Sequence, residues 1–489
     1  MELGNTSARL VKPAATSASE SPSAQSYGLK AAALSPLETL AQSIALIAPT
    51  GAPVMTIPLV FGLAGQGVAI AYLIATMGIL LVALNVNQFA RISASPGSLY
   101  TYIAEHMHPI VGVLAGWALL IAYIGTAAAV SAGVTNYANV ILRDRFGWEA
   151  LPVLLVAAVA VLAGWLAYRD VQISARLMLW LEAASVALIS ILAASIILRH
   201  GWRVDMGQLT LEGVTPEKLR LGLVLAIFSS VGFESATSLG SEARNPLTSI
   251  PRAVQWSAIL AGVFFFVCAY TEVLAFHAAG QALDKSPAPL HVLAQQAGLP
   301  PLIGTLTDLG AVVSFFSCFL ACITAAARVL FLMGRRGALH SFLGTAHEEN
   351  QTPHIAVLFT SVAALLPAAV LTMRGIDLFE IYGLLGTLAT FGFVTAYLLV
   401  SAAAPLYLRS QGRLTLRAVS ISILAVGAMC AALLGSLYPV PPPPYSVLPY
   451  LYAVLLLAGF GWSMVRTTRS PALSDAVAGD LAVAPTETD

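Results

Sequence analysis

Charged residues are scarce in this sequence. They make up 10% of its 489 residues, while hydrophobic residues make up 58%. A soluble globular domain is about 25% charged and about 45–50% apolar. Because so few charges cannot cover a water-exposed surface of this size, most of the chain must face an apolar solvent. The composition therefore predicts an all-α membrane protein with one large domain. The formal net charge of zero gives no indication of a nucleic-acid partner.

Several chemical motifs are also missing, and each absence removes a class of function. The four cysteines show neither a disulfide framework nor a zinc-ligand spacing. No Gly-x-x-x-x-Gly-Lys-Ser/Thr run is present, which excludes a P-loop nucleotide-driven pump. The nearest match to a zinc-protease motif, His347-Glu348-Glu349-Asn350, lacks the second histidine. We therefore expect no enzyme, no catalytic residue, and no cofactor or metal.

Long apolar runs fill the chain almost from end to end. A helix needs about 20 apolar residues to cross roughly 30 Å of hydrocarbon, and these runs lack the two-residue alternation of strands. The sequence predicts about twelve transmembrane helices, near residues 38–63, 65–89, 109–138, 150–168, 174–199, 218–240, 251–279, 304–333, 354–373, 378–401, 414–438 and 446–466.

The ends of the chain and the loops between the spans indicate its orientation. Residues 1–36 contain no apolar stretch of the kind a cleavable signal peptide needs, so they predict a disordered tail. The transmembrane domain is expected over residues 37–468, with a second tail over 469–489. If both tails are cytoplasmic, 16 of the 24 lysines and arginines lie on the cytoplasmic side. The positive-inside rule favours this topology for a multi-pass protein of the inner membrane.

Two of the expected spans contain residues that interrupt a helix. Span one holds Pro49, Gly51 and Pro53 within five residues, a spacing that is hard to fit into a continuous helix. Span six contains the polar, glycine-containing stretch Ser229–Glu234. Unpaired backbone in lipid costs several kcal/mol per group, so such breaks survive only against protein, water or a ligand.

The positions of these breaks point to a binding site. They are equivalent in two halves of five spans each, and paired interrupted helices indicate the substrate site of a transporter with inverted repeats. The half-helix after the first break offers N–H groups and a positive dipole end, which suit a carboxylate. The carbonyls that end the first half of span six suit an ammonium group. A site with both ends matches a zwitterion.

Three stretches of this sequence resemble the amino acid–polyamine–organocation (APC) permeases, and the resemblance covers roughly residues 38–466 in the family's order. They are Val231-Gly232-Phe233-Glu234-Ser235-Ala236 leading to Ser241-Glu242-Ala243-Arg244-Asn245-Pro246, then Pro96-Gly97-Ser98-Leu99-Tyr100-Thr101-Tyr102, and Ala327-Arg328-Val329-Leu330-Phe331-Leu332-Met333-Gly334-Arg335-Arg336-Gly337. The resemblance implies an inverted five-plus-five helix fold of the APC/LeuT type with two additional helices, working by alternating access.

The resemblance also implies roles for residues at matching positions. Phe228 matches an aromatic residue that covers the substrate, and Glu234 matches an acidic position linked in some relatives to proton sensing or gating. The expected substrate-binding residues are Thr50, Gly51, Ala52, Phe228, Ser229, Ser230, Val231 and Gly232. Thr126 in span three is a further candidate, which either lines the cavity or bonds the backbone of its own helix. The sequence departs from the family's glycine-rich first break, since Pro53 removes an N–H that would otherwise face a carboxylate.

Other acidic residues lie along the spans. Glu182 in span five is expected inside the hydrocarbon, either as a proton carrier or as a carboxylate bonded to a neighbouring helix. Glu272, His277 and Asp308 lie towards the ends of their spans and are expected to be solvated or interfacial.

Together these observations predict a secondary active transporter that moves amino acids across the cytoplasmic membrane. The coupling ion is expected to be a proton, with sodium coupling and exchange as open alternatives. A second hypothesis is an amine or polyamine transporter of the same fold, because a substrate without a carboxylate suits Pro53 and can use Glu234 as its counter-charge.

Overall fold

The structure of the protein is a computed structural model that describes residues 27–169, 171–200 and 205–468. Residues 1–26 and 469–489 of the two predicted tails lie outside the described residues. Residues ahead of the first helix pack against the helical domain. The Leu34 N–H donates to the Glu242 carbonyl (2.9 Å), and the Arg244 N–H donates to the Leu34 carbonyl (2.8 Å). Ordered packing thus begins before the expected boundary at residue 36.

The described chain is almost entirely helical, as predicted. Eleven helical segments of the described residues are long and apolar enough to cross a membrane, and the first of them, Pro36–Ala90, covers both of the first two expected spans. In chain order the α-helices are α1 (Pro36–Ile47), α2 (Ile57–Ala64), α3 (Val68–Ala90), α4 (Ser98–His106), α5 (Pro109–Phe146), α6 (Pro152–Arg169), α7 (Val171–Arg199), α8 (Met206–Leu209), α9 (Pro216–Ser230), α10 (Pro246–Ala278), α11 (Pro289–Gln296), α12 (Pro301–Arg335), α13 (His354–Met373), α14 (Leu378–Ser410), α15 (Leu416–Leu437) and α16 (Leu448–Thr468).

Helix α5 extends well beyond its predicted boundary. The apolar run predicts an end near residue 138, but the helix continues to Phe146. Gly147 ends it, because this residue adopts a positive φ of 72° and its N–H donates to the Arg143 carbonyl. Hydropathy predicts where a helix leaves the apolar solvent, whereas the capping residue decides where the helix stops.

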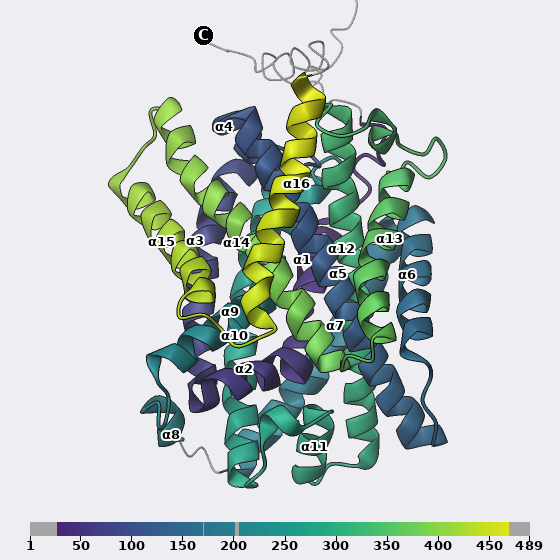
Figure 1. Ribbon diagram of the computed structural model, residues 1–489, viewed down its shortest axis with the longest axis vertical. Helices are drawn as coiled ribbons and strands as arrows, with labels where there is room; N and C mark the ends of the chain where they lie inside the picture. The colour runs from purple at the N-terminus through teal and green to yellow at the C-terminus, as the bar shows by residue number, and fades with distance from the viewer. Residues whose placement is uncertain (1–26, 170, 201–204, 469–489) are drawn as a thin grey trace, which may run out of the picture.

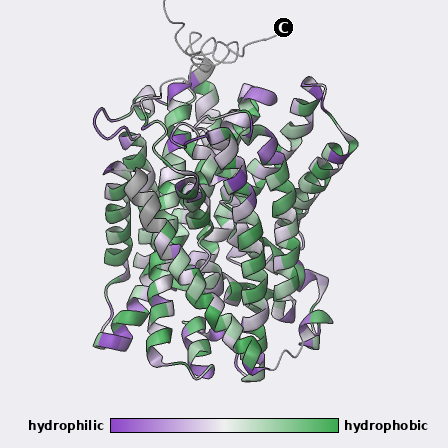
Figure 2. Ribbon diagram, turned by 180° about the vertical axis from the view of Figure 1, so that it is seen from behind, coloured by the Kyte–Doolittle hydropathy of each residue, from purple (hydrophilic) through white to green (hydrophobic). Residues whose placement is uncertain are grey.

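The long helices run side by side along the longest axis of the molecule (Figure 1). Helix α5 packs extensively against both α12 and α14, and these three form the centre of the bundle. Helices α6 and α13 pack together on one side, and α15 packs on α3 and α14. Figure 2 shows apolar residues along the middle of the helices and polar residues concentrated at both ends. This distribution fits a bundle whose outer surface faces lipid.

The first interruption lies between α1 and α2. Helix α1 ends at Ile47, Ala48 takes a left-handed conformation (φ 51°), and a π-helical turn over Ala52–Thr56 leads into α2. The Gly51 N–H donates to the Ala48 carbonyl at 2.7 Å. On the far side of the break, the Tyr137 hydroxyl of α5 donates to the Val54 carbonyl at 2.8 Å. A side chain of a neighbouring helix thus satisfies backbone that the break leaves without a regular helical partner.

The second interruption follows α9. Val231 is extended, Gly232 has a φ of 93°, and a short 3₁₀ helix begins at Ser235. The Gly232 N–H donates to the Tyr397 hydroxyl (3.1 Å) and not to a carbonyl of the preceding turn. The last carbonyls of α9 therefore lose their regular helical partners. Both interruptions that the sequence predicts are present.

The two interrupted spans meet through the side chain of Ser43 on α1. Its hydroxyl donates to the Phe233 carbonyl (2.7 Å) and accepts from the Ala236 N–H (3.1 Å). The Ser235 hydroxyl donates to the Gln42 carbonyl at 3.1 Å. Beside these bonds, Gly232 packs so closely on Leu46 that a Cβ at Gly232 would lie 2.0 Å from the leucine Cδ2. The first half of span one and the second half of span six are thus joined directly.

Gly232→Ala is predicted to destabilise the protein strongly. The new methyl group meets Leu46, and a non-glycine residue at this positive φ is strained by about 1–2 kcal/mol before the clash is counted. We expect a clearly lower melting temperature of the detergent-solubilised protein. Gly427→Ala in α15 is the matched control, since no atom lies within 4 Å of its added Cβ and alanine favours a helix. Equal melting temperatures for the two variants would contradict this account of the break.

Candidate functional site

Aromatic side chains also connect the two breaks. Phe228, the predicted aromatic residue of span six, makes an edge contact with Tyr382 of α14 at 5.7 Å between ring centroids. Tyr382 makes a similar contact with Phe315 of α12 at 5.6 Å. Phe315 in turn lies against Gly51, where an added Cβ would be 2.7 Å from the phenylalanine Cε1. These rings form a continuous wall from one break to the other.

Three of the predicted binding residues carry hydroxyl groups that have no partner. The side-chain oxygens of Thr50, Thr126 and Ser230 are buried and make no hydrogen bond to any described residue. Buried polar groups are almost always paired, so each exception requires an explanation. Thr126 lies one turn beyond Tyr123 on α5, on the face that also presents Tyr137. Unpaired hydroxyls from three separate helical segments are what a site for a polar ligand requires.

Ser229 of the same segment is occupied differently. Its hydroxyl is bonded to the Tyr72 hydroxyl of α3 at 2.7 Å. This bond fixes the second break against α3. Of the predicted binding residues with hydroxyl groups, Ser229 therefore holds a structural contact in this arrangement.

Glu234 is fully buried and accepts two hydrogen bonds. The Tyr123 hydroxyl of α5 donates to one carboxyl oxygen (2.8 Å), and the Tyr397 hydroxyl of α14 donates to the other (2.5 Å). Because Tyr397 also accepts from the Gly232 N–H, the carboxyl group is linked directly to the second break. Glu234 thus ties the interrupted span to the two central helices α5 and α14.

Glu182 lies at a different place from Glu234. One of its oxygens accepts from the Ser314 hydroxyl of α12 (2.9 Å), and the other is buried without a partner. The residue lines a cavity of about 550 Å³ between α1, α7 and α10, together with Pro49 of the first break. The structure therefore brings Glu182 next to the first break, and Glu234 next to the second.

The expectation that Glu272 and Asp308 are solvated is wrong. Both side chains are buried, and Glu272 is only 1% exposed. Asp308 is bonded to His291 of α11 at 2.7 Å. His277, by contrast, has a 62% exposed side chain, as expected. Position near the end of a span predicts solvation only if no other element covers that end, and here helix α11 covers Asp308.

Sequence reasoning missed the residues that complete the site from other helices. They are Tyr72, Tyr123, Tyr137, Phe315, Tyr382 and Tyr397, which lie around the candidate site. Each lies in an apolar run whose orientation about its own axis the sequence does not fix. The only signal that could have found them is the concentration of tyrosines in spans that otherwise contain few polar groups.

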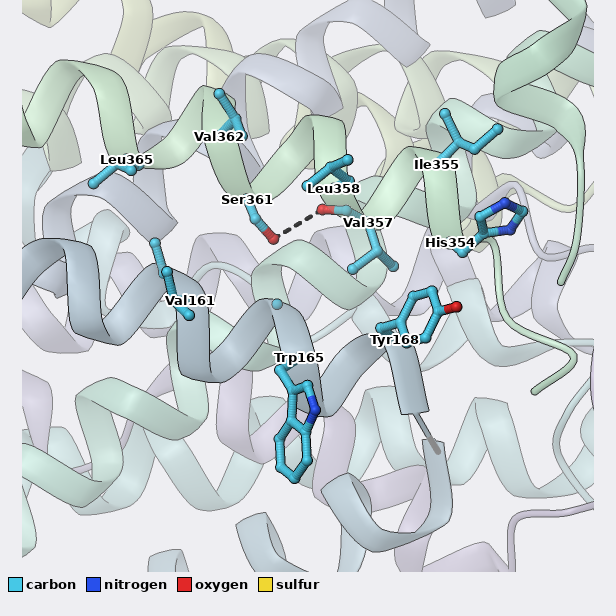
Figure 3. Close-up of a pocket in the computed structure, with 12 residues that line it drawn as sticks. Val161, Trp165, Tyr168, His354, Ile355, Val357, Leu358, Ser361, Val362 and Leu365 are labelled. Atoms are coloured by element: carbon cyan, nitrogen blue, oxygen red, sulfur yellow. Dashed lines mark hydrogen bonds between the residues drawn. The ribbon is translucent and has the colours of Figure 1, made fainter. Parts of the chain in front are cut away.

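A further pocket lies away from both breaks (Figure 3). It has a volume of about 440 Å³ and is bordered by α6 and α13, with Trp165, Tyr168 and His354 on its walls. The Ser361 hydroxyl that Figure 3 shows is already bonded to the Val357 carbonyl of its own helix (2.8 Å). None of the predicted site residues lines this pocket, so it is separate from the candidate site.

The sequence as a whole matches one family model. A model described as "Amino acid permease" covers residues 34–460, which include both breaks and all the predicted site residues. The chain belongs to this family. It is therefore a multi-pass membrane protein, and its family and fold are those of transporters, not enzymes.

Curated relatives of this permease include carriers of different substrates. The branched-chain amino acid permease BcaP of Bacillus subtilis is 26% identical over 71% of this chain and 75% of its own length. The low-affinity putrescine importer PlaP of Escherichia coli is 25% identical over 64% of this chain and 69% of its own. The cationic amino acid transporter 4 of Mus musculus is 24% identical over 75% of this chain and 59% of its own. Both amino acid and amine carriers are thus similar to this permease.

A solved structure confirms the predicted fold of this permease. The crystal structure of MhsT in complex with L-phenylalanine matches with a TM-score of 0.54 at 16% identity, over 83% of this chain and 99% of that one. At this identity the likeness shows the fold alone, which is the predicted APC/LeuT-type fold.

Ser230→Ala is predicted to weaken ligand binding without destabilising the unliganded permease. The hydroxyl has no partner to lose, so its removal costs no hydrogen bond in the unliganded protein. A hydrogen bond to a bound ligand is worth about 1 kcal/mol, or roughly fivefold in affinity. The measurement is the melting temperature with and without ligand. Ser361→Ala is the control, because that hydroxyl is bonded within α13; equal ligand-induced shifts in both variants would contradict the assignment.

Proposed function

We propose that this permease carries amino acids across the cytoplasmic membrane by alternating access, with both termini in the cytoplasm. The observation that supports it best is the joining of the two interrupted spans beside three unpaired buried hydroxyls, on Thr50, Thr126 and Ser230. The proposed substrate site comprises Thr50, Gly51, Ala52, Thr126 and the segment Phe228–Gly232. The aromatic wall beyond Phe228 shields the ligand from one side.

The proposal predicts saturable uptake by the purified permease in liposomes. A panel of amino acids is supplied outside the vesicles, each competed with its own decarboxylated amine. An amino acid substrate is expected to be displaced by other amino acids and only weakly by the amine, since the carboxylate contributes to binding at the first break. Absence of uptake and binding for every amino acid and amine tested would reject the proposal.

An amine or polyamine substrate is the second candidate. It is supported by Pro53, which removes an N–H from the first break, and by the relative that imports putrescine. Stronger competition by the amine than by its parent amino acid would favour this candidate.

Glu234 is proposed as the acid that makes gating respond to pH, and Glu182 as a candidate proton carrier. Glu234 lies between two tyrosine hydroxyls and is linked through Tyr397 to the second break. A change in its protonation therefore changes the hydrogen bonds that hold the break.

Glu234→Gln is expected to alter the pH profile of transport, because glutamine keeps the shape of the side chain and cannot titrate. The measurement is initial uptake between pH 5 and 8 in wild type and variant. A variant with the same profile as the wild type excludes Glu234 from this role. Glu217→Gln, at an exposed position in the first turn of α9, is the control and is expected to leave the profile unchanged.

A further inference from the structure

Glu272 of α10 differs from every other acidic residue of the membrane spans in its surroundings. Both of its carboxyl oxygens are buried, and neither has a hydrogen-bond partner in the described part of the chain. Glu234 accepts from two tyrosines, and Glu182 accepts from Ser314. Among the described residues, Glu272 also forms no ion pair with a lysine, arginine or histidine, whereas Asp308 pairs with His291 at 2.7 Å and Glu242 with Arg328 at 2.6 Å.

A charged carboxylate in these surroundings is unstable. Burying an ionised carboxyl group without hydrogen bonds or a counter-charge costs several kcal/mol. In this arrangement of the helices, Glu272 is therefore neutral and carries a proton. When water reaches the residue, this cost disappears and the carboxyl group can ionise.

The groups that face Glu272 give no counter-charge. Its titratable neighbours are Tyr72 from α3, Tyr137 from α5 and Cys268, one turn earlier on α10. The π-helical turn over Ala52–Thr56, which packs against α10, has no ionisable side chain. All of these groups are neutral near pH 7, so none can stabilise the ionised acid by charge.

The acidic groups on the other helices near Glu272 have partners of their own. Helix α7 contributes Glu182, which shares the wall of the 550 Å³ cavity with Cys268. On the elements that cover the end of α10, His291 of α11 is paired with Asp308, and Asp205 lies 3.9 Å from His277. None of the described groups around Glu272 supplies a positive charge to neutralise the ionised acid. Only a bound proton can therefore neutralise it.

The position of Glu272 connects it to both breaks. Its neighbour Tyr72 is bonded through its hydroxyl to Ser229, in the segment that leads into the second break. Cys268, one helical turn away, lines the same cavity as Pro49 of the first break. A change of charge at Glu272 therefore acts on residues that touch both halves of the proposed site.

We propose that Glu272 is a proton-binding site of this permease: it takes up one proton when its surroundings open to the acidic side of the membrane, holds it while the helices are closed, and releases it on the other side. The carboxylate oxygen accepts the proton from a hydronium ion, which becomes water, and on release the same O–H bond breaks and a water molecule on the other side takes the proton. This inference rests on the proposed transport function and adds the residue that carries the coupling proton.

The experiment uses the full-length permease in liposomes and the substrate identified by the uptake panel. Exchange is measured with labelled substrate at equal pH on both sides, and accumulation is measured with a pH difference of one unit. With the outside more acidic and the membrane potential held at zero, one proton per substrate predicts about tenfold accumulation by the wild type, because a tenfold proton ratio is worth about 1.4 kcal/mol. Glu272→Gln is expected to exchange normally but to reach only the external concentration.

Two further variants make the result specific. Glu272→Asp keeps a carboxyl group and is expected to accumulate substrate, which separates loss of the proton from loss of packing. Glu217→Gln removes a carboxyl group at an exposed position of α9 and is expected to behave as the wild type. Retained tenfold accumulation by Glu272→Gln would overturn the inference, as would loss of accumulation by Glu272→Asp with exchange intact.

The two levels of the proposal fail in different ways. If the wild type exchanges substrate but shows no accumulation under a pH difference, proton binding at Glu272 is rejected and the transport function stands. If the wild type neither binds nor exchanges any amino acid or amine, the transport function itself is rejected.

Discussion

The hydrogen bonds of Ser43 are the contact on which the rest of the structure depends. Breaking a membrane helix exposes backbone groups that lipid cannot satisfy, and each such group costs several kcal/mol. Ser43 bonds the Phe233 carbonyl and the Ala236 N–H, so a side chain of span one satisfies backbone groups at the break in span six. Gly232 permits this approach because it has no Cβ to meet Leu46. The two spans can therefore lose their regular backbone only together.

The central helices supply the remaining bonds. Tyrosines from the central helices α5 and α14 point their hydroxyls at the interrupted spans: Tyr137 at the Val54 carbonyl, Tyr397 at the Gly232 N–H and Glu234, and Tyr123 at Glu234. Tyrosine suits this task because its ring packs in an apolar bundle and its hydroxyl reaches a buried polar group. The hydroxyls of Thr50, Thr126 and Ser230 have no such partner among the described residues. The polar groups that no protein side chain satisfies are the groups that can bind a polar ligand.

The buried acids divide according to how completely they are bonded. Glu242 forms a two-bond ion pair with Arg328, both at 2.6 Å, and so joins two of the three family motifs far apart in the chain. Such a pair is held in one geometry because each charge needs the other once both are buried. Glu234 is bonded by neutral groups only, and Glu272 by none. The fewer partners a buried acid has, the more its stability depends on holding a proton, which is why the least bonded acid is the best candidate for coupling.

The sequence by itself determined the membrane class, the spans and the two breaks, because length, hydropathy, proline and glycine act locally along the chain. It also predicted roles for Glu234 and the Phe228–Gly232 segment, because these residues lie in or beside contiguous motifs. It could not identify Phe315, Tyr382 or the surroundings of Glu272, because these depend on the face that each helix turns to its neighbours. In a helix that is apolar all round, no periodicity marks that face. Only the packing of ten or more such helices decided which polar groups are paired, and therefore which remain for a substrate or a proton.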